Sequence, residues 1–425
     1  MGMILRIASS RIVGQGDIVG RSGYFSLNLS ANSVMRGRLD ARRTLKSLVA
    51  DLRIIMRILY FINGLSYKGG MARIVVDKAN YLSDVLGHEV TICTYNGKVE
   101  SAFKLSNNLI IRTIKSGGEN ATIMKKLGCI AKDIRKVGKV IQEVNPDIVI
   151  NAQTQVLTWI IPFVKRRVPK VMEIHFSKVG MDYNLHDKSK IFRTLYFGIA
   201  QFIYARYDRF VVLTEEDKHY WNVKNCVVIG NFTPLVSPVL SELDNKKIIC
   251  VARYHEQKRL DLLVEVWRRI HSKYKGWQID VYGMGPDKAW LQDRIDAVGV
   301  ADSFKLNDAV DNVMEKYLES SIFCLTSEHE GFGLVLAEAA MMGVPICAFD
   351  IVGVKWLLSD KKTALLCPFG DVDAFAQNLS MLIESRSLRV KLRTAAKKRM
   401  EDFRVEVIME KWNSLFEGCV NRLQI

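Results

Sequence analysis

Residues 322–349 read IFCLTSEHEGFGLVLAEAAMMGVPICAF, and this stretch contains one complete unit of an alternating α/β fold. The apolar run IFCLT predicts a strand, a helix is expected from about Leu334 to Met341, and PICAF predicts the next strand. A helix between two short apolar strands is typical of a parallel sheet, because parallel neighbours need a crossover connection. The stretch therefore predicts a doubly wound α/β fold.

The same alternation extends over most of the chain, starting at Met56. Strands are predicted for ILYFI, EVTICTY, DIVIN, KVMEIH, RFVVLT and CVVIG in the first half, and for KIICVAR and QIDVYG in the second. The segment FTPLVSPVLSELDNK (232–246), which contains prolines, interrupts the pattern. We expect two Rossmann-like domains that face each other across a crevice, at 56–235 and 236–405, and a C-terminal helix at 406–425 that packs back toward the first domain.

The composition is that of a globular protein with free thiols. With 49% hydrophobic residues and 8 prolines in 425 residues, the chain can bury a large core, which excludes disordered and collagen-like classes. The 8 cysteines form no C-x-x-C pair and the 7 histidines show no metal-ligand spacing, so we expect a cytoplasmic, reducing environment and no structural metal. Apolar runs such as VLTWIIPFV (156–164) are shorter than the roughly 18 to 20 residues that span a bilayer, so no transmembrane helix is expected.

The net charge of +16 is compatible with three kinds of partner: nucleic acid, an anionic membrane surface or phosphorylated small molecules. Residues 1–55 carry nine basic and three acidic side chains, so much of the charge lies there. The segment precedes MRILYFINGL, which begins at Met56 and looks like the natural first strand. We interpret it as a disordered extension or the product of an upstream start; a targeting or membrane-contacting segment is the alternative.

Two loops after predicted strands carry candidate phosphate-binding residues, and doubly wound sheets bind ligands at the carboxyl ends of their strands. Gly69 and Gly70 precede a predicted helix, so their backbone N–H groups could face an anion or a sugar; a tight turn is the alternative. Arg253 ends the first strand of the second half, and Lys258 lies five residues later. Together they could bind a diphosphate and neutralise a leaving group, or they could be two solvated loop charges.

A third loop, EGFG, precedes the helix of the opening stretch. Gly331, Phe332 and Gly333 separate Glu330 from Leu334, where the helix N-terminus would offer N–H donors to a phosphate. Glu338 lies eight residues after Glu330 and has apolar neighbours on both sides, LVLA and AAMM. This setting favours a ligand-binding carboxylate, which accepts hydrogen bonds from hydroxyl groups, over a solvated charge on the helix surface.

Residues 56 to about 410 resemble a family-4 retaining glycosyltransferase of the GT-B fold. EGFGLVLAEA (330–339) is similar to that family's motif of two glutamates separated by seven residues. VARYHEQK (251–258) resembles its Arg/Lys diphosphate-binding pair, and KGGMARIVVDKANYLSDVLGHEVTICT (68–94) resembles its first glycine loop, helix and second strand. The ordered combination is far more specific than any single motif.

The resemblance implies a role for each matching residue. Arg253 and Lys258 would bind the donor diphosphate, and Glu330 would contact the transferred sugar. Glu338 would bind the nucleotide ribose. His175, in MEIHFSK, matches a histidine that lines the pocket for the donor sugar and the acceptor.

Two glycines match the family, and two other positions depart from it. Gly283 and Gly285 in VYGMGPD match the glycine turn near the nucleotide base. The family usually has a glycine where this chain has Asn307, and an acidic residue where it has Lys355 or Trp356. Because these positions lie near the donor in the family, the sequence does not identify the donor.

A basic amphipathic helix is predicted in the first domain, within TIMKKLGCIAKDIRKVGKVIQE (122–143). Its apolar residues recur at alternating intervals of four and three: Ile123, Leu127, Ile130, Ile134, Val137 and Ile141. Basic side chains such as Lys125, Lys132 and Lys136 lie on other faces. The helix either packs on the core with a solvated basic face, or docks on anionic lipid, which would suit a lipid-linked acceptor.

Together these features predict a hexosyltransferase-type enzyme without cofactor or metal that uses a nucleotide-diphosphate sugar as co-substrate. The resemblance implies retention, and the expected context is polysaccharide or glycolipid assembly at the inner face of a membrane. A sugar-nucleotide-binding pseudoenzyme is the main alternative. A basic nucleic-acid-binding protein is a weaker one, because the body of the chain lacks a recognisable reading module.

Overall fold

The computed structural model describes residues 11–12, 54–67, 69–95, 97–115, 123–153, 156–233 and 237–422. Most of the predicted extension at 1–55 lies outside these residues. From that segment the structure describes β1 (Arg11–Ile12), which pairs antiparallel with β2 (Ile54–Ile55). None of the described helices combines the length and the apolar character needed to cross a bilayer.

The first large sheet has seven strands, in the order β5-β4-β3-β6-β7-β8-β9. Its strands are β3 (Arg57–Ile62), β4 (Glu89–Thr94), β5 (Ile110–Thr113), β6 (Ile148–Asn151), β7 (Lys170–Glu173), β8 (Arg209–Val212) and β9 (Cys226–Val228). The central strand β3 pairs in parallel with β4 and β6, and Tyr60 lies opposite both Ile92 and Ile150. Leu59, Tyr60 and Phe61 are fully buried, which explains the continuous apolar run in this strand.

The helices that follow these strands alternate with them as predicted. They are α2 (Gly70–Asp84), α3 (Ile123–Val144), α4 (Val156–Ile160), α5 (Lys178–Tyr183), α6 (Lys190–Tyr204) and α7 (Glu215–Trp221).

The second large sheet has six strands, in the order β12-β11-β10-β13-β14-β15. Its strands are β10 (Lys247–Val251), β11 (Gln278–Gly283), β12 (Phe304–Asp308), β13 (Ile322–Leu325), β14 (Ile346–Asp350) and β15 (Leu365–Pro368). Each of these strands pairs in parallel with its neighbours. The two parallel sheets with intervening helices confirm the predicted doubly wound α/β class.

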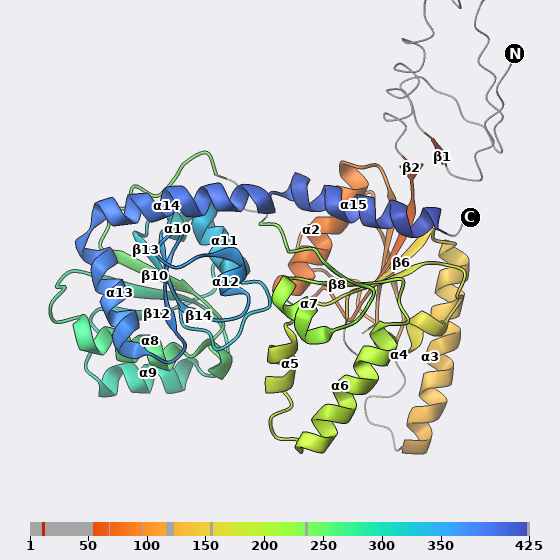
Figure 1. Ribbon diagram of the computed structural model, residues 1–425, viewed down its shortest axis with the longest axis horizontal. Helices are drawn as coiled ribbons and strands as arrows, with labels where there is room; N and C mark the ends of the chain where they lie inside the picture. Colours follow the sequence, from red (N-terminus) through yellow and green to blue (C-terminus); the bar gives the residue numbers. More distant parts are fainter. Residues whose placement is uncertain are drawn as a thin grey trace, which may run out of the picture. The chain divides into compact units, whose positions relative to one another are not determined.

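Helices cover both faces of the six-stranded sheet (Figure 1). Helices α8, α9 and α13 lie on one face, and α10, α11 and α14 lie on the other. Their bounds, with those of α12 and the C-terminal helix α15, are α8 (Leu260–Ile270), α9 (Lys288–Ala297), α10 (Val313–Leu318), α11 (Leu334–Met341), α12 (Val354–Leu357), α13 (Val372–Glu384), α14 (Arg386–Met400) and α15 (Val405–Asn421). The expected helix between IFCLT and PICAF is therefore present as α11.

The order of the six strands fixes where a ligand site can form. The chain proceeds outward from β10 to β11 and β12, and then returns to β13 on the other side of β10. At such a reversal, the loops after the two central strands diverge and leave a crevice at the carboxyl end of the sheet. The loops after β10 and β13 contain Arg253, Lys258 and Glu330, so the topology brings three of the predicted site residues to this point.

The described chain divides into two compact units. The first contains the described parts of residues 1–68, Val75–Lys170 and the residues from Leu415 onward, and the second contains Gly69–Ile74 and Val171–Ser414. All predicted site residues belong to the second unit. The predicted domain boundaries near residues 235 and 405, and the packing of the C-terminal helix, stay predictions.

Among the described side chains of α3, the predicted apolar stripe is buried only in part. Val137 and Ile141 are buried, but Ile130 and Ile134 are 38% and 40% exposed. Asp133 is buried in their place, and its carboxylate accepts a hydrogen bond from the hydroxyl of Tyr95. The buried side of the helix therefore includes Asp133, and two isoleucines of the predicted stripe face solvent. The side chains of residues 123–129, which include Lys125, lie outside the described part.

Candidate functional site

The loop after β10 brings Lys258 to a carboxylate of the loop after β13. Lys258 Nζ lies 2.7 Å from Glu330 Oε1, and the two side chains are 13% and 12% exposed. Lys258 ends a short 3₁₀ turn, which His255 caps by accepting a hydrogen bond from the backbone N–H of Gln257. Arg259 follows with a left-handed backbone (φ 44°) and redirects the chain into α8. The structure therefore brings together the predicted pair of Lys258 and Glu330.

Arg253 lies on the same loop, and its side chain is exposed. Its guanidinium Nη2 lies 3.4 Å from Gln257 Oε1, where it donates a weak hydrogen bond. Exposure leaves the remaining guanidinium donors accessible to an anion, because this arginine has no carboxylate partner among the described residues.

Gln257, which was not singled out in the sequence, joins the two loops. Its side-chain Nε2 donates to the backbone carbonyl of His329 at 3.0 Å, and its backbone carbonyl accepts from the backbone N–H of Glu328 at 2.9 Å. Thr326 Oγ1 adds a further bond to the carbonyl of Lys258 at 3.0 Å. These bonds hold the two loops in register, so that Lys258 and Glu330 are positioned by the backbone around them.

Glycines in and beside the turn from Glu330 to Gly333 occupy positions that have no room for a side chain. A Cβ atom on Gly331 would lie 2.5 Å from the carbonyl oxygen of His175, and one on Gly353 would lie 2.7 Å from the carbonyl oxygen of Glu330. Gly333 has a left-handed backbone (φ 75°) and forms the N-cap of α11. The glycines thus let the turn approach His175, which brings a third predicted residue next to Glu330.

The N-terminus of α11 has no side-chain cap. Its third residue, Leu336, donates its N–H to the carbonyl of Gly333, whereas the N–H groups of Leu334 and Val335 have no hydrogen-bond partner among the described residues. Phe332 is 3% exposed and packs against Phe403, so its side chain belongs to the core. The uncapped N–H groups and the helix dipole favour an anion at this end.

Glu338 is buried in the middle of α11 and is 5% exposed. One carboxylate oxygen lies 3.1 Å from Arg73 Nη1, and the other accepts a hydrogen bond from the hydroxyl of Tyr317 at 3.1 Å. Burial raises the pKa of Glu338, whereas Arg73 and the Tyr317 hydroxyl act in the opposite direction. The expectation that Glu338 is not a solvated charge is confirmed.

Arg73, another residue missed in the sequence, connects the glycine loop to Glu338. It belongs to the first turn of α2, three residues after Gly70. A Cβ atom on Gly70 would lie 3.2 Å from Leu334 Cδ1, so the start of α2 also contacts the start of α11. The glycine loop at Gly69 and Gly70 is therefore close to the helix N-terminus that offers donors to an anion.

Two histidines lie beside the Glu330 turn. The His175 side chain is 5% exposed, and neither ring nitrogen has a hydrogen-bond partner within the described part of the chain; its Nε2 lies 3.5 Å from Glu173 Oε1. His329, which the sequence did not indicate, contacts the ring of Tyr183 at a centroid distance of 4.9 Å. Burial lowers the pKa of His329. The site thus holds one histidine with unsatisfied nitrogens and a second whose neutral form is favoured.

Gly283 and Gly285 have a packing role that the sequence did not reveal. A Cβ atom on Gly283 would lie 1.8 Å from the carbonyl oxygen of Ala252, and one on Gly285 would lie 2.1 Å from that of Tyr254. The glycines therefore let the loop after β11 contact the backbone of the loop after β10. The Tyr254 hydroxyl also donates to the carbonyl of Asn307 at 2.6 Å. Asn307, where the family usually has a glycine, therefore contacts the same loop.

Lys355 lies at the other position where the sequence departs from the family. Lys355 Nζ lies 3.2 Å from Glu216 Oε1, and this pairing raises the pKa of Lys355. The lysine therefore forms a surface ion pair in place of the acidic residue that the family usually has there.

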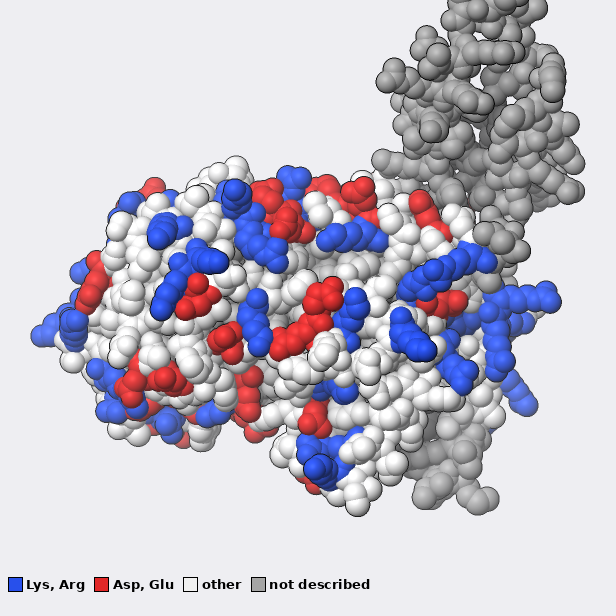
Figure 2. Space-filling model, in the orientation of Figure 1, with Lys and Arg blue, Asp and Glu red and all other residues white. Residues whose placement is uncertain are grey.

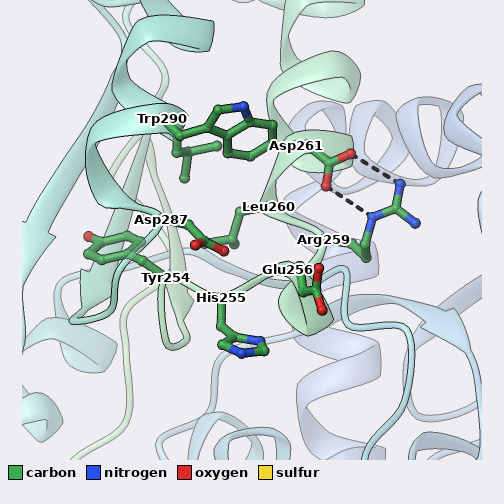
Figure 3. Close-up of a pocket in the computed structure, with 9 residues that line it drawn as sticks. Tyr254, His255, Glu256, Arg259, Leu260, Asp261, Asp287 and Trp290 are labelled. Carbon is green, nitrogen blue, oxygen red and sulfur yellow. Dashed lines mark hydrogen bonds and ion pairs between the residues drawn. The ribbon is translucent and has the colours of Figure 1, made fainter. Parts of the chain in front are cut away.

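A cavity of about 320 Å³ lies beside the loop after β10 (Figure 3). Trp290 and His255 lie at its two ends, and Arg259 forms a two-pronged ion pair with Asp261 at 3.1 Å for both contacts. Its lining residues are Tyr254, His255, Glu256, Arg259, Leu260, Asp261, Asp287, Trp290 and Leu291. Lys258, Glu330 and Glu338 are not among them, so the candidate site is marked by converging charges and a helix N-terminus rather than by this cavity.

Two protein families match this chain over adjacent segments. The model described as "Glycosyltransferase Family 4" matches residues 68–234, and the model described as "Glycosyl transferases group 1" matches residues 236–399. An "Uncharacterized glycosyltransferase" of Haemophilus influenzae is 27% identical over 84% of this chain and 99% of its own length. "Amylovoran biosynthesis glycosyltransferase AmsD" of Erwinia amylovora is 25% identical over the same shares of the two chains.

Solved structures share the fold. The structure of TarM from Staphylococcus aureus, in complex with fondaparinux, α-GlcNAc-glycerol and UDP, superposes with a TM-score of 0.67 over 85% of this chain and 100% of that chain, at 16% identity. With the two parallel sheets, this likeness confirms the predicted GT-B fold.

Proposed function

Since the chain belongs to the group 1 and family 4 glycosyltransferases, we propose that it is a retaining hexosyltransferase that uses a nucleoside diphosphate sugar as donor. The acceptor is a saccharide or a lipid-linked saccharide. One observation carries the proposal: Lys258 and Glu330 form a partly buried ion pair, 2.7 Å apart, on the two loops at the reversal of strand order. Glu330 also lies three residues before Gly333, the N-cap residue of α11, which provides no side-chain cap.

The first proposed role is diphosphate binding. The phosphate oxygens accept hydrogen bonds from the backbone N–H groups of Leu334 and Val335, while Arg253 and Lys258 supply positive charge. Lys258 exchanges its contact with Glu330 for the diphosphate. The released carboxylate then accepts hydrogen bonds from hydroxyl groups of the donor sugar.

The second proposed role is stabilisation of the leaving group. The bond between the anomeric carbon and a diphosphate oxygen breaks, and negative charge gathers on the diphosphate. Arg253 and Lys258 stabilise this charge where it develops. Since two protein cations supply it, we propose a reaction that needs no divalent ion.

The third part of the proposal is the transfer of the sugar to the acceptor. The acceptor hydroxyl oxygen forms its bond on the face of the anomeric carbon from which the diphosphate departs, and its proton passes to a departing phosphate oxygen. This order of events retains the configuration. The two unsatisfied nitrogens of His175 are proposed to hydrogen-bond hydroxyl groups of the sugar or the acceptor, since buried polar atoms without partners are costly.

Glu338 is proposed to bind the ribose of the donor nucleotide. Arg73 and Tyr317 each contact one of its carboxylate oxygens. A carboxylate can accept about four hydrogen bonds, so both oxygens keep capacity for ribose hydroxyl groups. Burial raises the pKa of Glu338, and the ion pair with Arg73 acts against this rise in favour of the charged, accepting form.

The proposed context is assembly of a cell-surface polysaccharide at the cytoplasmic face of a membrane. The similarity to the Erwinia protein of amylovoran biosynthesis supports a polysaccharide product. The solved TarM structure, which holds UDP and a saccharide, supports a uridine nucleotide and a saccharide acceptor.

Calorimetric titration with UDP, paired with turnover of UDP-sugars, tests this proposal. We expect UDP to bind the parent protein, and Glu338→Gln to weaken that binding by about 1.5 to 3 kcal/mol, the usual contribution of a charged hydrogen bond. Glu265→Gln is the matched control, because Glu265 pairs with Arg268 and Arg269 on the surface of α8. Binding without any turnover of a panel of UDP-sugars would indicate a pseudoenzyme. Absence of binding by any nucleoside diphosphate would refute the donor site.

A further inference from the structure

Helix α6 exposes a continuous apolar face to solvent. Five of its large side chains are between 47% and 75% exposed: Ile191, Phe192, Leu195, Ile199 and Phe202. Four of them are spaced four, four and three residues apart, which places them in one stripe along the helix, and Phe192 adjoins it. We call these five side chains the α6 apolar face.

The opposite side of α6 is firmly packed, so the exposure is not a sign of a loose helix. Ala200, Ile203 and Tyr204 are buried. The ring of Tyr204 lies 5.1 Å from Trp221 of α7 and 4.8 Å from Phe210 of β8. The helix is thus anchored on one side, and its apolar face is presented outward.

Basic side chains flank the α6 apolar face. Residues 185–209 contain five lysines and arginines against two aspartates, and α6 itself has no acidic residue. Lys188 and Lys190 precede the stripe, and the Arg206 guanidinium stacks 4.3 Å from the ring centre of Phe202 at the other end. Figure 2 shows blue lysine and arginine atoms beside white, uncharged surface where α6 lies.

This combination fits the surface of an anionic bilayer. A helix of this kind lies in the interface, with its apolar side chains among the acyl chains and its lysines and arginines at the headgroups. A second copy of the chain is a poorer occupant, because a symmetric contact through α6 would bring the basic flanks of both copies together.

The α6 apolar face is connected to the candidate site through α5. A Cβ atom on Gly180 would lie 2.6 Å from the His329 ring, and the ring of Tyr183 also contacts His329, the neighbour of Glu330. The chain then runs from Tyr183 to Lys190, where α6 begins. Seven residues span at most about 25 Å, so a bilayer on α6 would lie within reach of the loop after β13.

We propose that the α6 apolar face, with its basic flanks, docks the enzyme on an anionic bilayer and that the acceptor is presented there as a lipid-linked saccharide. This inference rests on the proposed glycosyltransferase function and names the surface that delivers its acceptor.

Vesicle co-sedimentation of the full chain tests the docking surface. The probes are vesicles of phosphatidylcholine alone and vesicles with about 30 mol% phosphatidylglycerol, an anionic lipid that attracts basic surfaces. We expect the parent to bind the anionic vesicles, and Leu195→Gln with Ile199→Gln to weaken that binding at least about tenfold, because two exposed aliphatic groups leave the acyl region. The matched control is Val239→Gln with Met381→Gln, whose parent side chains are 61% and 48% exposed elsewhere in the second unit.

A second variant examines the charge. Lys188→Glu with Lys190→Glu should also weaken binding, and added salt should weaken the parent in the same way. UDP binding by each variant, which does not depend on lipid, keeps the two proposals separate. If the glutamine variant binds anionic vesicles as well as the parent does, the docking proposal is wrong while the donor site stands. If the parent does not bind vesicles but forms a dimer, and the glutamine variant is monomeric, the α6 apolar face contacts a second copy of the chain. The docking proposal is then likewise overturned.

Discussion

Two regions of the molecule differ in how they expose their side chains to water. They are the loops after β10 and β13, and the α6 apolar face. In the loops, a lysine and a glutamate are largely withdrawn from water and paired at 2.7 Å, and backbone hydrogen bonds fix their positions. On α6, large apolar side chains that could have been buried are left in solvent. Both arrangements are unfavourable without a ligand, since one withholds charges from water and the other exposes apolar surface.

This contrast assigns donor binding to the loops and membrane docking to α6. The loops would exchange an internal ion pair for a diphosphate, and α6 would exchange water for lipid. Each exchange can be blocked without the other, because the two regions share no residue. The variants below are chosen to break one region at a time.

Removal of the Lys258 ammonium should have the largest effect. Lys258→Ala should lower the transfer rate about 100- to 1,000-fold, because one donor to the developing charge is lost. Glu330→Gln should also depress transfer but keep or raise the affinity for nucleoside diphosphate, since the lysine loses its competing partner at 2.7 Å. Rates and calorimetric affinities of the purified variants check both expectations.

Lys273→Ala provides the control, because Lys273 forms an exposed ion pair with Glu384 on the surface of the second unit. It should bind and turn over like the parent. If Lys258→Ala and Glu330→Gln do the same, Lys258 and Glu330 are not the centre of the site. Loss of vesicle binding by Lys258→Ala would instead show that the two regions are coupled.

Two glycine substitutions should change stability in opposite directions. Gly331→Ala places a Cβ atom 2.5 Å from the carbonyl oxygen of His175, so we expect a loss of about 1 to 3 kcal/mol in the free energy of unfolding. Gly198→Ala, in α6, meets nothing within 4 Å and should gain about 0.5 to 1 kcal/mol from helix propensity. Urea unfolding measures both. A neutral Gly331→Ala would mean that the turn is not tightly packed against His175.

The sequence predicted the centre of each sheet better than its edges. Central strands such as β3 and β10 are buried on both faces and therefore read as continuous apolar runs. The edge strands β5, β12 and β15 were not predicted. Residues of β5 and β12 are partly exposed, and IIRT and FKLND lack such a run, whereas the buried run of β15 has only three residues before Pro368.

The candidate site was predicted where it depends on local spacing. Arg253, Lys258 and Glu330 follow strands at short distances in the sequence, so their loops could be placed from topology. Arg73 could not be found this way, because its contact with Glu338 joins positions 265 residues apart. Gln257 was missed for a different reason, because a neutral amide in a loop gives no sign of its hydrogen bond to His329, whereas the charges of Lys258 and Glu330 indicated a pair with the same separation in sequence.

The exposure of the α6 apolar face could not be predicted from the sequence for a different reason. KIFRTLYFGIAQFIY is apolar on most of its circumference, and such a helix is usually buried. Only the packing of Tyr204 against Trp221 identifies which side is covered. The basic periodicity of α3 pointed to a membrane surface on a different helix.

The smallest effect is expected from charge reversal on α3, and it compares the two helices directly. Among its described side chains, α3 exposes two isoleucines at 38% and 40%, against five apolar side chains at 47% to 75% on α6. Lys132→Glu with Arg135→Glu should therefore weaken binding to anionic vesicles by only about threefold, from the loss of diffuse attraction. Co-sedimentation beside the α6 glutamine variant measures the difference. A loss on α3 as large as that on α6 would mean that basic charge, rather than exposed apolar surface, determines where this enzyme meets the membrane.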